Sequence, residues 1–159
     1  MALDCSKCDG GMARSTEASV ALLRRHGAID FATGELLSDV GAFGDSIDSH
    51  HIFPIAYCRS QGIEIEKYNC LVNRTPLSAS TNRVIGGKAP SVYLTKLEEQ
   101  GISRRRLNTI LRSHLIEPDF LWRDDFEGFF RARMQALTQL VNQAIGSNES
   151  VSLELRNCK

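Results

Sequence analysis

The chain has 159 residues, of which 42% are hydrophobic and 24% are charged, and its formal net charge is zero. That length suits one domain with a substantial hydrophobic core and is short for two. The sequence has no long apolar run, which argues against a membrane span. The balanced charge gives no support to nucleic-acid binding as a property of the whole protein, so any basic patch must be local.

The N-terminal residues and the cysteines bear on the compartment. The first residues lack the apolar core of a secretory signal, so we expect a cytoplasmic protein. Cys5, Cys8, Cys58, Cys70 and Cys158 make an odd number, which fits poorly with a closed disulfide framework. Cys5 and Cys8 have the CxxC spacing of half a zinc knuckle, and the other interpretation is a frayed N-terminus. A four-cysteine zinc site would have to recruit Cys58 and Cys70.

The N-terminal third predicts a short helix, a turn-rich segment and a strand. Residues 17–25 have the pattern of an amphipathic helix that Gly27 ends. Residues 30–44 are rich in turn signals and predict a short hairpin or loop. Residues 47–53 then read as a strand that Pro54 ends. This predicted strand contains the first candidate catalytic and metal-binding residues.

The middle of the chain predicts a second strand and then a helix. Residues 54–68 are mixed and partly helical, and residues 70–72, Cys-Leu-Val, are the candidate for the second strand. Ser80 begins a short helix that Gly86-Gly87 stops. The expected order is therefore strand, strand, helix.

The C-terminal half predicts three helices, at residues 91–100, 103–115 and 124–145. Asp124 and Glu127 match a capping box at the start of the last helix. Apolar residues recur at helical spacing and predict a core face: Phe126, Phe130, Leu137, Val141 and Ala144. The expected fold class is α+β, with one domain over residues 15–146 and tails at 1–14 and 147–159.

Two adjacent histidines at the end of the first predicted strand are the strongest chemical signal. A neutral imidazole is a good ligand for a divalent metal and a base near neutral pH. Adjacent residues on a strand point to opposite faces, but at a strand end both can turn toward one site. His50 and His51 could therefore divide the two roles. Asp48 could be a further ligand, a partner of His50 or a turn residue.

Asparagines and basic residues form the second half of the pattern. A carboxamide oxygen is a hard, neutral ligand that suits an ion such as Mg²⁺, and it can also hold an imidazole in one orientation. Asn73 and Asn82 are the candidates. Arg74, Arg83 and Lys88 flank the expected metal and are candidates for binding phosphate.

These residues together resemble a known family. Residues 48–54, Asp-Ser-His-His-Ile-Phe-Pro, followed by Asn73 and then by Asn82 on a helix, resemble the ββα-metal motif of HNH endonucleases. Further likeness in residues 30–34 and 81–94 is to the C-terminal HNH domain of GmrSD-like modification-dependent restriction proteins. The resemblance covers roughly residues 15–142.

The resemblance implies a role for each residue that matches the motif. His51 falls at the position of the general base, His50 at the first metal ligand and Asn82 at the second. Asn73 falls at the middle Asn, which braces the loop and orients the base. The family often has an acidic residue where His50 stands, and a nitrogen ligand there shifts the metal preference from Mg²⁺ toward Mn²⁺, Ni²⁺ or Zn²⁺.

The function implied by the resemblance is metal-dependent hydrolysis of DNA phosphodiester bonds, in restriction or phage defence. The expected architecture is a ββα-metal core with additional C-terminal helices. The expected partners are DNA and a ParB-like nucleotide-dependent domain in cis or in trans, without a membrane. Two alternatives stay open: a non-catalytic nucleic-acid-binding module on the same fold, and a structural zinc domain.

Overall fold

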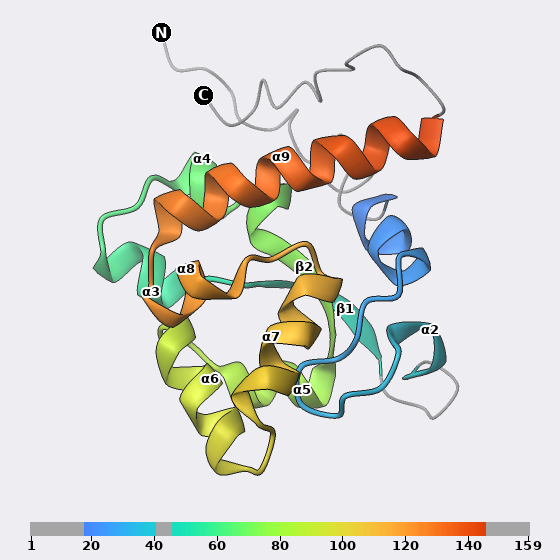
Figure 1. Ribbon diagram of the computed structural model, residues 1–159. Helices are drawn as coiled ribbons and strands as arrows, with labels where there is room; N and C mark the ends of the chain where they lie inside the picture. Colours follow the sequence, from blue (N-terminus) through green and yellow to red (C-terminus); the bar gives the residue numbers. More distant parts are fainter. Residues whose placement is uncertain (1–17, 41–45, 146–159) are drawn as a thin grey trace, which may run out of the picture.

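The computed structural model describes residues 18–40 and 46–145. Its fold is α+β: a two-stranded antiparallel sheet surrounded by helices (Figure 1). A helix at residues 18–25 comes first. The later elements are α2 (Leu37–Val40), β1 (Ile47–His51), α3 (Ile55–Ser60), α4 (Ile65–Tyr68), η3 (Leu71–Asn73), β2 (Arg74–Ser78), α5 (Ala79–Ile85), α6 (Pro90–Glu99), α7 (Arg104–Ser113), α8 (Pro118–Trp122) and α9 (Phe126–Ile145).

The two strands and the helix that follows them form a compact unit. β1 and β2 pair with Ile47 opposite Ser78 and His51 opposite Arg74. α5 begins directly after β2, where Ser78 Oγ accepts a hydrogen bond from the backbone N–H of Thr81 and caps the helix. α5 also packs against both strands. The predicted order of strand, strand and helix is confirmed.

The predicted position of the second strand was wrong. Residues 70–72 are not a strand: Leu71–Asn73 forms a turn of 3-10 helix, and β2 follows it. The apolar Val72 is buried in the core rather than paired in a ladder. β2 contains Pro76, which breaks the usual strand pattern. Proline is tolerated here because each strand of a two-stranded sheet is an edge strand.

The first strand is shorter than predicted. β1 ends at His51. The backbone N–H of Ile52 still donates in register to the carbonyl of Asn73 at 2.9 Å, but the N–H of Phe53 donates to the side-chain oxygen Oδ1 of Asn73, also at 2.9 Å. The chain thus leaves the ladder just beyond the two histidines. This sharp departure places them at the end of the sheet.

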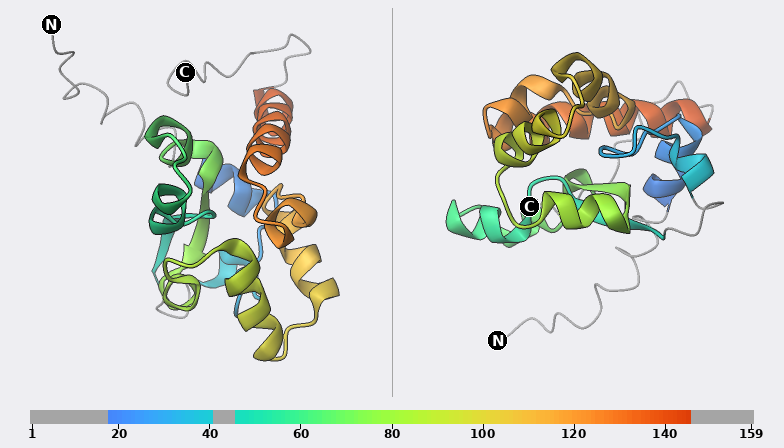
Figure 2. Two further views of the ribbon diagram at one scale, coloured as in Figure 1. Left: turned by 90° about the vertical axis from the view of Figure 1, so that its left-hand side faces the viewer. Right: turned by 90° about the horizontal axis from the view of Figure 1, so that it is seen from below.

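The C-terminal helices cover the sheet unit as a second layer. Viewed from below, the segment through β1, β2 and α5 forms one layer, and α7 to α9 lie over it (Figure 2). The main core lies between the layers and includes Phe53, Leu77, Leu94, Leu111 and Phe129. A smaller cluster of Leu23, Ala28, Leu37 and Leu137 joins the helix at residues 18–25 to the far half of α9.

The helix predictions hold with small shifts in their ends. The predicted helix at residues 124–145 begins at Phe126, and the proposed capping box was wrong. Asp125 Oδ1 instead accepts from the N–H of Gly128 at 2.9 Å. Asp124 has a left-handed backbone (φ 54°), and its carboxylate accepts from the N–H of Ser91 at 2.8 Å and from its hydroxyl at 2.7 Å.

The sequence predicted the N-terminal helix and the turn-rich segment but missed α8. The helix at residues 18–25 is confirmed, and Gly27 ends it with a positive φ of 88°. The first part of the turn-rich segment is a short hairpin, with an antiparallel bridge between Ile29 and Leu36, and α2 follows it. Residues 41–44 of that segment lie outside the described residues. α8 was not predicted. Within the described residues, none of the helices is both long and apolar enough to cross a bilayer.

Candidate functional site

Asn73 braces the segment that follows the two histidines. Its Oδ1 accepts from the N–H of Phe53, and its Nδ2 donates to the carbonyls of Phe53 at 2.9 Å and of Tyr68 at 2.8 Å. The side chain is fully buried. The hydrogen bonds of its side chain therefore go to backbone groups, and none that the described residues make goes to His51.

A different asparagine contacts the candidate base. His51 Nε2 lies 3.2 Å from Oδ1 of Asn69, and the same oxygen accepts a hydrogen bond from Nη2 of Arg74 at 3.0 Å. Burial, with the nearby charge of Arg74, lowers the pKa of His51 to about 4. His51 is therefore neutral near pH 7, and the lowered pKa makes it a weaker base than an ordinary histidine. Asn69 gives no local signal in the sequence, because an Asn after a helix reads as a turn residue.

His50 lies next to His51 but has different surroundings. Burial lowers its pKa, the charge of Asp48 acts to raise it, and the charge of Arg74 lowers it further. Its Nε2 is buried and has no hydrogen-bond partner among the described residues. A buried imidazole nitrogen without a partner calls for an explanation, and a missing ligand is one. Asp48 itself is exposed.

Asn82 lies on α5, which packs against β1. The side chain is half-buried, and its carboxamide makes no hydrogen bond within the part of the chain that the structure describes. An imidazole nitrogen and a carboxamide oxygen are each donor types that a divalent ion accepts. In the described ranges, no group of three or more His, Cys, Asp or Glu side chains is placed to hold a metal ion.

Asp30 positions the junction between β2 and α5 and was not singled out from the sequence. Its carboxylate accepts from the backbone N–H of Ser78 at 2.9 Å and from the hydroxyl of Thr81. It also accepts from the N–H groups of Ala32 and Thr33, each at 3.1 Å. Burial would raise the pKa of Asp30, but these hydrogen bonds outweigh it and lower the pKa.

The three candidate phosphate ligands lie in different surroundings. Arg74 is half-buried beside Asn69, and burial lowers its pKa. Arg83 on α5 and Lys88 beyond it are both exposed. Arg74 is thus the cation that shares a contact with His51, while Arg83 and Lys88 are free to meet a partner at the surface.

The described cysteines are buried thiols. Cys58 Sγ donates to the carbonyl of Phe53 at 3.4 Å, and Cys70 Sγ donates to the carbonyl of Lys67 at 3.1 Å. Burial raises the pKa of Cys58 to about 11, so its thiol stays protonated near neutral pH. Cys5, Cys8 and Cys158 lie outside the described residues.

Three consecutive arginines, residues 104–106, begin α7, and from the sequence they could either track phosphates or form a solvated helix face. Arg104 pairs with Glu98 at 3.3 Å and lies 3.9 Å from the centroid of the Trp122 ring. Arg106 donates to the carbonyl of Gly34 at 3.1 Å. These contacts favour the interpretation of the run as a solvated helix face rather than a phosphate track.

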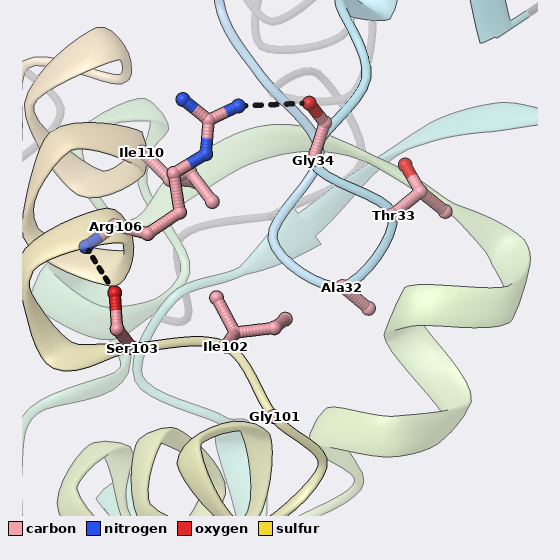
Figure 3. Close-up of a pocket in the computed structure, with 8 residues that line it drawn as sticks. All are labelled: Ala32, Thr33, Gly34, Gly101, Ile102, Ser103, Arg106 and Ile110. Carbon is pink, nitrogen blue, oxygen red and sulfur yellow. Dashed lines mark hydrogen bonds between the residues drawn. The ribbon is translucent and has the colours of Figure 1, made fainter.

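A cavity of about 360 Å³ lies beside Arg106 (Figure 3). It opens between residues 32–34 and the connection at residues 101–103, and Ile110 completes its wall. The predicted site residues do not line it. The cavity is therefore separate from the group around His51.

Comparison with known proteins adds a distant relative. No protein-family profile matches the chain, and no solved structure matches it. An uncharacterised protein of Methanocaldococcus jannaschii is 28% identical over 117 residues, which cover 62% of this chain and 20% of that protein. The chain thus spans about a fifth of the length of this relative.

Proposed function

We propose that the chain is a metal-dependent endonuclease with an HNH-type ββα-metal core that hydrolyses DNA phosphodiester bonds. The observation that carries the proposal is the contact of His51 and Arg74 with one oxygen of Asn69, at the end of paired strands that lead directly into α5. A neutral imidazole and a guanidinium side by side are the base and the counter-charge that phosphodiester hydrolysis requires.

Each residue has a defined task in this reaction. His51 is neutral near pH 7 and takes a proton from the attacking water. Arg74 faces the phosphate and offsets its negative charge. His50 and Asn82 would hold a divalent ion, with Asp48 close enough to act on His50. When bound, such an ion stabilises the charge that develops on the leaving oxygen.

The nitrogen donor of His50 bears on the choice of metal. A ligand set of one imidazole and one carboxamide is less selective for Mg²⁺ than a carboxylate set, so Mn²⁺, Ni²⁺ and Zn²⁺ are also candidates. Arg83 and Lys88 are exposed and would contact DNA backbone.

The biological setting is part of the proposal. The proposed partner is a ParB-like nucleotide-dependent domain, in cis or in trans, and the proposed setting is cytoplasmic restriction or phage defence.

A cleavage assay tests the proposal. The purified full chain, stripped with a chelator, is incubated with supercoiled plasmid and Mg²⁺, Mn²⁺, Ni²⁺ or Zn²⁺. We expect nicking with at least one metal and its loss in His51→Ala. His26→Ala is the matched control because His26 is exposed and lies in another part of the fold. Full activity in His51→Ala contradicts the role of the base. Salt-sensitive DNA binding without cleavage by any metal would favour the non-catalytic alternative.

A further inference from the structure

The carboxamide of Asn69 lies between the ends of the two paired strands. Its Oδ1 is 3.2 Å from Nε2 of His51 and 3.0 Å from Nη2 of Arg74. His51 and Arg74 are opposite each other in the strand register. The same oxygen atom of Asn69 therefore contacts both the candidate base, His51, and the candidate phosphate ligand, Arg74.

The donors and acceptors at this point fix the tautomer of the imidazole. A guanidinium only donates, so the Asn69 atom that faces Arg74 must be the carbonyl oxygen and not the amide nitrogen. That oxygen only accepts, so Nε2 of His51 must carry a hydrogen. In a neutral imidazole the other nitrogen then holds the lone pair. The lone pair of His51 is therefore on Nδ1.

The position of Asn69 is itself fixed by the brace around Asn73. The N–H of Asn69 donates to the carbonyl of Ile65 at 2.9 Å, at the end of α4. On one side of it, the carbonyl of Tyr68 accepts from Asn73 Nδ2 at 2.8 Å, and on the other, the carbonyl of Cys70 accepts from the N–H of Asn73 at 3.1 Å. The brace that holds the chain after β1 thus also holds the segment that presents Asn69.

We propose that Asn69 is the positioning residue of the nuclease site: its carboxamide oxygen holds His51 in the tautomer whose Nδ1 is the basic atom, and it keeps the guanidinium of Arg74 beside that imidazole. The inference rests on the proposed function. Asn69 touches neither the water nor the phosphate and acts through its two neighbours. Losing its oxygen releases both the base and the cation.

The step that Asn69 supports balances without a further reactant. The water oxygen forms a bond to phosphorus, and the bond from phosphorus to the leaving oxygen breaks. The water proton moves to Nδ1 of His51, and the leaving oxygen takes a proton from solvent. Arg74 stays charged throughout.

Kinetics on a labelled DNA duplex separate positioning from folding. We expect Asn69→Ala to lower kcat by about 10- to 100-fold, the usual effect of removing a group that orients a functional side chain. KM should rise as well, because Arg74 loses its acceptor. Asn69→Asp keeps an acceptor oxygen at the same place and should restore kcat toward the wild-type value. Asn108→Ala is the matched control, since Asn108 accepts from Trp122 Nε1 at 2.8 Å in another part of the fold.

A double variant and a spectroscopic measurement complete the test. In a His51→Ala background, Asn69→Ala should lower the kcat of any residual cleavage no further, because the effect on kcat passes through the imidazole, while KM should still rise through Arg74. Nitrogen NMR of the chelated wild-type chain near neutral pH should show His51 with its hydrogen on Nε2, and Asn69→Ala should populate the other tautomer.

The outcomes distinguish this inference from the function on which it rests. Wild-type kcat and KM in Asn69→Ala, or a wild-type His51 with its hydrogen on Nδ1, would overturn the positioning role while plasmid cleavage persists. A wild-type chain that cuts DNA with none of the four metals overturns the nuclease, and the assignment of Nδ1 as a base falls with it.

Discussion

Asn73 holds Phe53 through both of its backbone polar groups: Oδ1 accepts from the N–H of Phe53 at 2.9 Å, and Nδ2 donates to its carbonyl at 2.9 Å. Phe53 follows His51 by two residues and is buried in the main core. One carboxamide therefore holds the backbone of a core residue that lies two residues from the candidate base. A change at Asn73 should act on stability first and on the site as a consequence.

Asn73→Ala should strongly destabilise the fold. The substitution leaves the N–H and carbonyl of Phe53 and the carbonyl of Tyr68 without partners in a buried region, at about 1–3 kcal/mol for each such group. We expect the free energy of unfolding to fall by at least about 3 kcal/mol in urea titration. Asn82→Ala is the matched control, because the carboxamide of Asn82 has no hydrogen-bond partner among the described residues, and its effect should stay within about 0.5 kcal/mol. Equal effects of the two variants would contradict the brace.

Asp30→Asn should loosen the junction between β2 and α5. The amide keeps one acceptor oxygen but places a donor group toward the N–H of Ser78 or the hydroxyl of Thr81. Because the carboxylate is buried and accepts from several groups, we expect a loss of about 2 kcal/mol or more in the free energy of unfolding. Hydrogen exchange should localise the change to α5. The exposed Asp39, changed to Asn, serves as the control and should have little effect. If the amides of α5 exchange as slowly in Asp30→Asn as in wild type, Asp30 does not stabilise this junction.

The sequence could predict the parts of the molecule that depend on local pattern. Helical periodicity located α6, α7 and α9 to within a few residues, since each buries one face along its length. The adjacent histidines and the strand, strand, helix order were also readable. Asn69 and Asp30 were not, because their roles depend on partners that folding alone brings together, such as Thr81 for Asp30. Likewise, the apolar residues 70–72 read as a strand, although Val72 is buried in the core and the ladder starts at Arg74.

Arg133 on α9 should be needed for stability even though it has no acidic partner among the described residues. Its guanidinium is buried and donates to the carbonyls of Val72, of Arg74 at 2.8 Å and of His114 at 3.2 Å. Arg133→Met preserves much of the volume but leaves these carbonyls unpaired, so we expect a loss of about 2–4 kcal/mol in the free energy of unfolding.

Arg131→Met provides the matched control for this variant, since Arg131 is exposed on the same helix. We expect its effect to lie within about 0.5 kcal/mol. A stability equal to wild type in Arg133→Met would mean that the buried guanidinium costs as much in desolvation as its hydrogen bonds return.

The buried His114 should make the fold sensitive to acid. His114 Nε2 donates to the carbonyl of Ile29 at 2.7 Å, since a carbonyl only accepts, and its Nδ1 then accepts from the hydroxyl of Thr75 at 2.6 Å. Burial is the main cause that lowers the pKa of His114 to about 4, and the charge of Arg133 lowers it further while Asp30 acts to raise it.

The direction of the pH effect follows from that lowered pKa. Unfolded His114 takes up a proton below about pH 6.5, whereas folded His114 resists protonation until about pH 4. The free energy of unfolding is therefore highest above pH 6.5 and falls as the pH decreases toward 4, by at most about 1.4 kcal/mol per pH unit from this group. His51 has a lowered pKa in the same range and adds to the slope.

Urea titrations at several pH values between about 7.5 and 4.5 measure this slope. His114→Gln should be less stable than wild type near neutral pH, because one buried contact is lost, but its stability should depend less on pH. Adding His51→Ala should flatten the dependence further. Asn108→Ala, which changes no ionisable group, should leave the slope unchanged. A His114→Gln chain with the full wild-type slope would show that other groups, and not the buried imidazole, take up the protons on unfolding.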